Sequence, residues 1–202
     1  MAWAPPESEK FGKWALGAVT PATVMGPYYP VLNKPAQANA DLARLAPGGP
    51  RARGHPLRVT GRVVDVMGRP ASGVTFEIWQ ANSSGRYDHP SDGNPAELDP
   101  HFKGYGMSVT DRDGRYSFDT IVPAGYPVVP GWHRAPHIHF LVTGRCDRHV
   151  TQMWFPGHPL NAQDRLLLNL PAAERQRVTA KLAPGMEADA TVAMFDLVLT
   201  NG

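Results

Sequence analysis

The sequence has very little cysteine, since Cys146 is the only one in 202 residues. A single cysteine cannot form an internal disulfide, and it cannot supply the several thiolates of a sulfur-rich metal site. Any bound metal would therefore be held by nitrogen and oxygen ligands. The low cysteine content also agrees with a reducing compartment.

The sequence also lacks long apolar runs and an excess of charge of one sign. No apolar stretch reaches the roughly 20 residues that a membrane-spanning helix needs. Residues 1–13 have neither the basic start nor the continuous apolar centre of a secretory signal, so we expect a cytoplasmic protein without a membrane partner. The formal net charge is +2, with both signs scattered along the chain. Without a basic stripe to neutralise phosphates, nucleic acid is not an expected partner.

Proline and glycine, in contrast, are frequent, with 21 and 20 residues respectively. They divide the chain into many short segments, which favours a β-rich fold. In residues 1–56 such breakers dominate and periodicity is weak, so this region is expected to be an extended arm that contributes to a pocket and to subunit contacts. Residues 57–202 are then expected to form one catalytic β-sandwich domain.

Alternation of apolar and polar residues begins at Leu57 and predicts strands separated by turns. Two short helical runs are expected later, one capped by Asn161 and running toward Leu168, the other starting at Pro171. Many short strands with few helices predict an all-β protein, an antiparallel β-sandwich with a long N-terminal arm and one or two short helices. The expected strands are Leu57–Asp65, Val74–Trp79, Arg115–Asp119, His137–Thr143, His149–Phe155 and Ala190–Leu199.

The segment Arg134–Phe140 carries two histidines, His137 and His139, two positions apart. On an extended strand, residues two apart point to the same side, so one metal ion could accept both imidazoles. A pair of surface histidines on a half-exposed strand is the plain alternative.

Two other kinds of metal site that use such a pair match the sequence poorly. A cupin adds a nearby glutamate, but no glutamate occurs between Glu97 and Glu174. A zinc hydrolase adds a third histidine or a carboxylate, and Asp147 and His149 do not stand at a recognisable spacing for this role. The remaining candidate ligands are tyrosines.

Tyr87 and Tyr126 are both expected in loops rather than at alternating strand positions. Tyr87 closes the segment Trp79–Tyr87, and Tyr126 lies in Pro123–Pro127, ahead of the histidine pair. Each could equally be a half-buried packing residue whose hydroxyl meets water or a backbone group. The residues alone leave both possibilities open.

These residues belong to a series of ordered motifs that resembles the intradiol ring-cleavage dioxygenases, and above all the iron-bearing β chains of the protocatechuate 3,4-dioxygenase group. The resemblance covers roughly residues 57–199 and extends into the arm, where Gly26-Pro27-Tyr28 is similar to a pocket element of the family. The C-terminal Met194–Leu199 is similar to its closing strand. The motifs, in order, are W-Q-A-N-x-x-G-R-Y (79–87), L-D-P-x-F-x-G-x-G (98–106), T-D-x-D-G-x-Y-S-F (110–118), G-Y-P (125–127) and R-x-P-H-I-H-F (134–140).

The resemblance implies one non-haem iron(III) held by Tyr87, Tyr126, His137 and His139, with O₂ as co-substrate and a small aromatic diol as substrate. Phenolates are hard anionic donors that favour iron(III), and imidazoles complete a site without sulfur. In the family, the tyrosine matching Tyr126 leaves the metal and helps to take up the substrate protons. The ring is cleaved between its two hydroxylated carbons to a cis,cis-muconate-type diacid.

The resemblance also implies roles for residues around the metal. Arg134 matches an arginine that stabilises negative charge on the substrate ring, and a guanidinium stays charged at any working pH. An ordinary surface ion pair is the alternative. Gln152 matches a glutamine that lies beside the iron ligands, and a strand glutamine pointing to water is its alternative. The residues expected to line the substrate pocket are Gly26, Pro27, Tyr28, Val128 and Arg134.

Two departures from the family pattern bear on the substrate. The protocatechuate enzymes carry a tryptophan where this chain has Val128, and the stretch from Tyr126 to His137 is shorter by two residues, so the pocket wall must differ. Catechol and hydroxyquinol dioxygenases carry a helical dimerisation domain for which residues 1–56 are too few, which favours the protocatechuate branch. The cationic partner of a substrate carboxylate is left open among Lys103, His133, Arg112 and a neighbouring subunit.

Assembly and function keep several alternatives. A homo-oligomer is expected, with pairing to a homologous second subunit as the alternative. A catechol or hydroxyquinol dioxygenase, an iron-free sandwich subunit or binding module, and a zinc hydrolase built on His137 and His139 are the other candidate functions. The four intact ligand positions argue against the binding module and the hydrolase.

Overall fold

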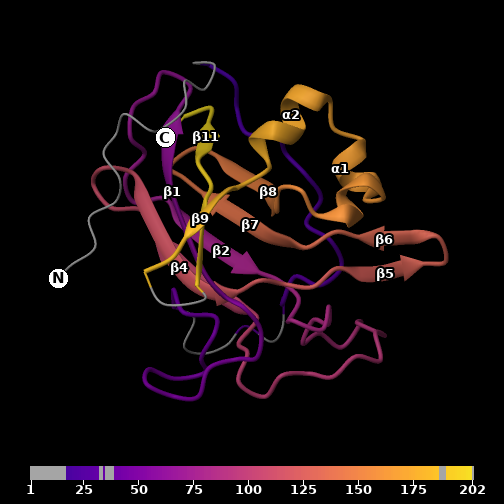
Figure 1. Ribbon diagram of the computed structural model, residues 1–202. Helices are drawn as coiled ribbons and strands as arrows, with labels where there is room; N and C mark the ends of the chain where they lie inside the picture. Colours follow the sequence, from indigo (N-terminus) through magenta and orange to yellow (C-terminus); the bar gives the residue numbers. More distant parts are fainter. Residues whose placement is uncertain (1–16, 32–33, 35–38, 187–189, 202) are drawn as a thin grey trace.

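Two β-sheets lie face to face and form the body of the protein (Figure 1). The computed structural model describes residues 17–31, 34, 39–186 and 190–201. In the first sheet β1 pairs with each of β4, β10 and β11, and β10 pairs with β9; these strands are β1 (Pro56–Asp65), β4 (Arg115–Ile121), β9 (Lys181–Pro184), β10 (Thr191–Met194) and β11 (Leu197–Leu199). The second sheet has the order β3 (Tyr105–Val109), β2 (Thr75–Trp79), β7 (His137–Thr143), β8 (Arg148–Trp154). Strands β5 (Tyr126–Val129) and β6 (Trp132–Arg134) form a hairpin of their own.

The all-β sandwich predicted from the alternating pattern is confirmed, but it is not antiparallel throughout, because β1 pairs in parallel with β10 and β11. On β1, for example, Leu57, Val59 and Val63 are buried between the sheets, while Arg58 is exposed. The pattern did not predict β3, β5, β6 and β9, because β6 has only three residues and the other three are short strands that hold Gly or Pro.

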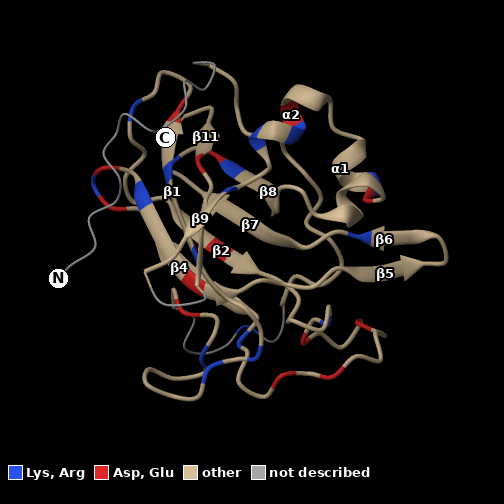
Figure 2. Cartoon of the chain, viewed as in Figure 1, with Lys and Arg blue, Asp and Glu red and all other residues tan. Residues whose placement is uncertain are grey.

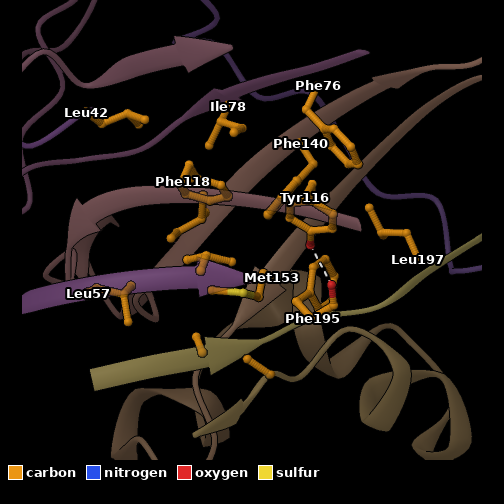
Figure 3. Close-up of a cluster of buried hydrophobic side chains, with 14 of the residues drawn as sticks. Leu42, Leu57, Phe76, Ile78, Tyr116, Phe118, Phe140, Met153, Phe195 and Leu197 are labelled. Carbon is orange, nitrogen blue, oxygen red and sulfur yellow. Dashed lines mark hydrogen bonds between the residues drawn. The ribbon is translucent and has the colours of Figure 1, made fainter. Parts of the chain in front are cut away.

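Aromatic side chains from both sheets fill the space between them (Figure 3). Phe76 of β2 lies against Tyr116 of β4, with ring centroids 4.4 Å apart. Phe140 of β7 meets Phe118 of β4 edge-on at 5.8 Å. These contacts join the sheet that carries the histidine pair to the sheet that holds the chain's C-terminal strands.

The predicted strand Ala190–Leu199 is two strands, so that prediction was wrong in its extent. Both β10 and β11 run parallel to β1 in the same register, with a break at Phe195 and Asp196. At the break the Asp196 carboxylate accepts a hydrogen bond from the backbone N–H of Arg62 at 2.9 Å, where a strand carbonyl would otherwise stand. The Phe195 carbonyl turns inward and accepts the Tyr116 hydroxyl (Figure 3).

Two short helices, α1 (Arg165–Leu168) and α2 (Ala172–Arg177), follow a 3₁₀ turn at Pro159–Ala162 and lie beside β8 and the β5–β6 hairpin (Figure 1). The prediction of short helices is confirmed, and Pro171 directly precedes α2. The prediction of Asn161 as a cap was wrong: Asp164 caps α1, and the Asn161 amide instead donates to the Phe155 carbonyl at 2.8 Å. In the described part of the chain, no helix has the length and apolar character that a membrane crossing requires.

Residues 17–31 of the arm run along the outer strand β8 and then, at Gly26 and Tyr28, over the face of the second sheet that is turned away from the sandwich core. The N–H of Thr23 donates to the Val150 carbonyl at 2.9 Å, and the Thr151 hydroxyl donates to the Pro21 carbonyl at 2.8 Å. Strand β7 is therefore buried on both faces, from His137 to Val142. The rest of the predicted arm includes residues 1–16, 32–33 and 35–38, which lie outside the described residues, and the boundary at residue 56 stays a prediction.

Gly61 offers a test of the close approach between β1 and the break that follows β10. A Cβ atom at this position would overlap the Phe195 carbonyl oxygen. We expect Gly61→Ala to lower the free energy of unfolding by about 2 kcal/mol or more, since the neighbour is backbone and cannot move aside. Urea denaturation measures this, with Gly93→Ala as the control because a Cβ there meets nothing within 4 Å. Equal midpoints for the two variants would contradict the close approach.

Candidate functional site

The second sheet places four side chains in one row on the face beneath the arm. Directly paired residues of antiparallel strands share a face, and His139 pairs with Trp79 on one side and with Gln152 on the other. Trp79 pairs in turn with Tyr105. The row therefore runs Gln152, His139, Trp79, Tyr105 across four strands, and His137 stands one alternation away from His139 on the same face.

The two imidazoles present their Nε2 atoms to each other at 3.1 Å. The Nδ1 atom of His137 lies 2.6 Å from the Ala135 carbonyl oxygen, which can only accept, so this nitrogen carries the proton and Nε2 presents a lone pair. The ring of His139 is stacked on Trp79, with centroids 4.8 Å apart and an interplanar angle of 8°. Both rings are thus held with a nitrogen aimed at one point.

The two tyrosines join this point from other segments. The Tyr87 hydroxyl lies 3.3 Å from Nε2 of His137. The Tyr126 ring lies 5.7 Å from the rings of both Tyr87 and His137. The structure therefore brings all four sequence-predicted ligand residues together.

Local turns explain how the tyrosines reach the site. Tyr87 lies in a loop, as expected, and its N–H donates to the Asp92 carboxylate at 2.7 Å. Tyr126 was expected in a loop but is the first residue of β5. The two segments touch at Gly85, where φ is +79° and a Cβ atom would lie 2.6 Å from the Gly125 carbonyl oxygen. Only glycine allows this approach of two backbones, which sets Tyr87 beside Tyr126.

Burial keeps the four side chains uncharged in the absence of a cation. It raises the pKa of Tyr87 well above its usual range, and the neighbouring Tyr126 adds to this effect. Burial also raises the pKa of Tyr126 to about 12, although the Arg134 guanidinium acts in the opposite direction. The pKa of His137 and of His139 is lowered well below the usual range, chiefly by burial. A bound cation is the kind of partner that would ionise these phenols.

The donor atoms suit a hard metal ion. The Tyr87 hydroxyl oxygen lies 3.3 Å from Nε2 of His137, and this nitrogen lies 3.1 Å from Nε2 of His139. Tyr126, whose ring packs beside His137, adds a second oxygen nearby. In residues 17–31, 34, 39–186 and 190–201, no group of three or more His, Cys, Asp or Glu could hold a metal ion. A metal at this point would therefore depend on the tyrosines, which favours iron(III) over a zinc site completed by a third histidine or a carboxylate.

Arg134 and Gln152 form a buried polar pair next to the histidines. The Nη2 atom of Arg134 donates to Oε1 of Gln152, and the Gln152 amide donates to the Val24 carbonyl at 2.8 Å. The Arg134 side chain also forms an ion pair with Asp164 at 3.0 Å. Neither Arg134 nor Gln152 lies at the surface, where the alternatives of a solvent-exposed ion pair and a water-facing glutamine would place them.

Comparison with known proteins gives a consistent picture. The model of the family described as "Dioxygenase" matches residues 24–201. The chain is 42% identical to the protocatechuate 3,4-dioxygenase beta chain of Burkholderia cepacia over 165 residues, 79% of this chain and 70% of that one. The chain belongs to the intradiol dioxygenase family. Its members are aromatic ring-cleaving enzymes that typically use non-haem iron(III), and their substrates are aromatic diols.

Two further relatives of this intradiol dioxygenase differ in length. Catechol 1,2-dioxygenase of Acinetobacter baylyi is 32% identical over 201 residues, 90% of this chain but 62% of the relative, so the chain spans less than two thirds of that protein. The solved dioxygenase domain of a fusion with a carbohydrate-binding protein from Streptomyces sp. SirexAA-E has a TM-score of 0.67 and 27% identity, and the match covers 92% of this chain and 100% of that one.

The predicted pocket residues of the arm lie against the proposed iron ligands. Gly26 has φ +74°, and a Cβ atom there would lie 3.3 Å from the His139 ring. The Tyr28 ring lies 4.7 Å from the Tyr87 ring. Pro27 stands between Gly26 and Tyr28 in the sequence. Val128 is on β5, in the same hairpin as Tyr126, with 42% of its surface exposed. Its place in the pocket wall stays a prediction.

The three cationic residues considered for a substrate carboxylate have other surroundings. The Lys103 ammonium donates to the Asn39 side chain and to the Asp41 carbonyl, each at 2.8 Å. Arg112 has 92% of its side chain exposed. His133 pairs with Pro127, next to the Tyr126–Arg134 pair, so it points to the opposite face of the hairpin. The contacts of these three residues do not direct them toward the ligand candidates.

Asp164 is a buried residue next to the candidate site that sequence reasoning missed. It is fully buried, and its carboxylate accepts hydrogen bonds from Arg134, from the Ala135 N–H at 3.1 Å and from the Trp154 indole at 3.0 Å. The same carboxylate caps α1 by accepting from the Leu166 N–H at 3.0 Å. An Asp directly before a short apolar run could have signalled the cap, but nothing local signals the partner 30 residues earlier in the chain.

Breaking the Arg134–Asp164 pair is expected to be costly. Asp164→Asn leaves the Arg134 guanidinium buried without its counter-charge, and we expect the free energy of unfolding to fall by about 3 kcal/mol. Urea denaturation of the purified protein measures this. Glu174→Gln is the control, because Glu174 pairs with Arg177 at 3.6 Å in a more exposed setting and should cost about 0.5 kcal/mol. Similar losses in both variants would show that Asp164 contributes no more than a surface charge.

Proposed function

We propose that Tyr87, Tyr126, His137 and His139 bind one iron(III), and that the enzyme cleaves protocatechuate or a related substituted catechol between its two hydroxylated carbons. Both atoms of O₂ enter the product, a cis,cis-muconate-type diacid. The observation that carries the proposal is the convergence of the Tyr87 hydroxyl and both histidine Nε2 atoms at 3.1 to 3.3 Å in a buried, uncharged setting.

The protein's own groups prepare the substrate. Iron(III) held by these four residues would supply Lewis-acid chemistry that makes the aromatic diol reactive toward O₂. As a phenolate ligand Tyr126 would take up a substrate proton on leaving the metal, and burial, which raises the pKa of its free phenol to about 12, would keep that proton on the phenolic oxygen. Arg134 faces the charge that develops on the ring, and its guanidinium is held in orientation by Asp164 and Gln152. The stack of Trp79 on His139 fixes the orientation of that imidazole.

The identity of the ring substituent is the finer part of the proposal. The Burkholderia relative, named for protocatechuate, supports a carboxylate-bearing catechol. The carboxylate would then meet a cation from a neighbouring subunit, since Lys103 is bound to the arm and His133 faces away. The same contacts favour a second candidate, catechol or hydroxyquinol, which needs no cationic partner.

Visible absorption of the iron-loaded protein tests the ligand set. Two tyrosinate ligands predict a broad charge-transfer band, and anaerobic addition of protocatechuate or catechol should shift it. His137→Ala and His139→Ala should reduce bound iron by at least about tenfold, because each removes one of four ligands. Tyr126→Phe should retain iron and slow chelation of the catechol.

The control for the histidine variants is His55→Ala, whose ring is exposed at the edge of β1 and bonds to Thr191. It should load iron as the wild type does. Full iron content and full turnover in His139→Ala would overturn the ligand assignment. A colourless wild-type protein after ferric loading would overturn the proposed function itself. The substrate that shifts the band and gives the ring-opened diacid with two ¹⁸O atoms from ¹⁸O₂ identifies the native substituent class.

We propose, in addition, that the chain acts as a homo-oligomer. All four proposed iron ligands stand on this one chain, which supports a single chain type, while the likeness to a beta chain keeps pairing with a second subunit type as the alternative. Native mass measurement of the purified chain should give two or more times the 22.0 kDa of one chain. A monomer that loads iron but turns over no catechol would point instead to a missing second subunit type.

A further inference from the structure

A carboxylate outside the proposed iron site gathers three hydrogen-bond donors. Glu77 stands on β2 two residues before Trp79, on the same face of the sheet. Its Oε2 atom accepts from the Tyr29 hydroxyl, the Tyr105 hydroxyl and the Lys34 ammonium, each at 2.6 Å. The Glu77 side chain is only 17% exposed, and its contacts with the two tyrosines are partly buried, whereas Lys34 approaches from the exposed side.

Two of these donors come from the arm and the third from the sheet. Tyr29 and Lys34 belong to the arm, whereas Tyr105 is on β3. The Lys34 ammonium also lies over the Tyr29 ring, 5.0 Å from its centroid. Glu77 therefore ties the arm to the edge of the second sheet that is formed by β2 and β3.

The arm is tied down a second time on the other side of the site. The Thr23 N–H donates to the Val150 carbonyl at 2.9 Å, and the Gln152 amide donates to the Val24 carbonyl at 2.8 Å. Both partners are on β8. Between this attachment and Glu77 lies Gly26–Tyr28, the segment that packs on His139 and Tyr87. The arm wall Gly26–Tyr28 is thus attached to the sheet on both sides, to β8 before it and to Glu77 after it.

The Glu77 anchor also reaches the histidine ligand through aromatic packing. The Tyr29 ring meets Trp79 edge-on, with centroids 5.0 Å apart. Trp79 is in turn stacked on His139. A shift of Tyr29 would therefore move both the arm wall and the Trp79 ring that supports His139.

The charge of Glu77 is well supported. Burial alone would raise its pKa, but the hydrogen bonds from Lys34, Tyr105 and Tyr29 outweigh this and lower the pKa below the usual range. The carboxylate is therefore ionised at neutral pH, and its hydrogen bonds are of the stronger, charge-assisted kind.

We propose that Glu77 is a positioning residue whose carboxylate clamps the arm wall Gly26–Tyr28 over the iron site. The kinetic consequence rests on the proposed function, whereas the clamp itself does not. In this proposal the wall contacts the substrate equally before and during the reaction, so a looser wall would weaken uniform binding. Such a loss raises KM and leaves kcat nearly unchanged.

Hydrogen–deuterium exchange of the iron-loaded enzyme tests the clamp. Glu77→Gln keeps the shape of the side chain and removes its charge. We expect amide exchange in the arm segment 23–31 to accelerate about tenfold, with β7 unchanged, because only local opening is affected. Tyr29→Phe removes one of the three donors and keeps the ring on Trp79, so it should give a smaller acceleration in the same segment.

Steady-state kinetics with catechol and protocatechuate give the second readout. KM in Glu77→Gln should rise about fivefold or more, with kcat within about twofold of the wild type. Glu97→Gln is the matched control, because Glu97 pairs with Arg53 through a mostly exposed side chain. It should match the wild type in both exchange and kinetics.

Three outcomes would overturn the clamp. The first is arm exchange in Glu77→Gln equal to that of the wild type. The second is equal acceleration in the arm and in β7, with a lower denaturation midpoint, which would make Glu77 a general stability residue. The third is a fall in kcat at constant KM. If Glu77→Gln does not fold, Tyr29→Phe carries the same comparison. A wild-type enzyme that turns over no catechol would defeat the proposed function, while the exchange data would still decide the clamp.

Discussion

The burial of β7 on both faces is the constraint on which the rest of the structure depends. One face of this strand, with Ile138, Phe140 and Val142, packs into the sandwich core. The other face carries His137 and His139 and is closed by the arm. Alternation along one strand thus couples the position of the proposed iron ligands to the core of the fold. A shift of one residue in register would exchange the two sets, so the hydrophobic core itself fixes the direction of the imidazoles.

Arg134 and the arm, which lie next to β7, are held in place by shielded carboxylates rather than by surface ion pairs. Figure 2 shows acidic and basic residues of both signs distributed over the strands and loops. Two carboxylates differ from most of these: Asp164 is shielded and orders Arg134, and Glu77 is shielded and orders the arm. They lie on opposite sides of the row that runs from Gln152 to Tyr105. Asp164 fixes the Arg134 guanidinium, and Glu77 fixes the Tyr29 hydroxyl and the Lys34 ammonium. The residues next to these partners in the sequence do not by themselves hold them in place.

The sequence predicted the sandwich from strand alternation, which is short-range order, whereas the set of four converging residues was predicted from the resemblance of the ordered motifs to the intradiol dioxygenases. Strand alternation marks β1 and β7, and the spacing of His137 and His139 is enough to place them on one face. What could not be predicted depends on contacts between distant segments. The break at Phe195 depends on Gly61 and Tyr116, and the roles of Asp164 and Glu77 depend on partners many residues away. Tyr126 was expected in a loop because the β5–β6 pairing that makes it a strand residue has no periodic signal of its own.

The motif glycines show why local patterns nevertheless identified so much of the site. Gly85 allows the Tyr87 loop to meet the backbone at Gly125, and Gly26 allows the arm to pass close to the ring of His139. At both positions φ is positive and a side chain would meet the groups that carry the ligands. Glycine at these two positions therefore allows two segments to approach closely, and it is not there to make the chain flexible. Because that distance sets where Tyr87 and the arm wall stand, a short sequence pattern carries information about a site assembled from four separate parts of the chain.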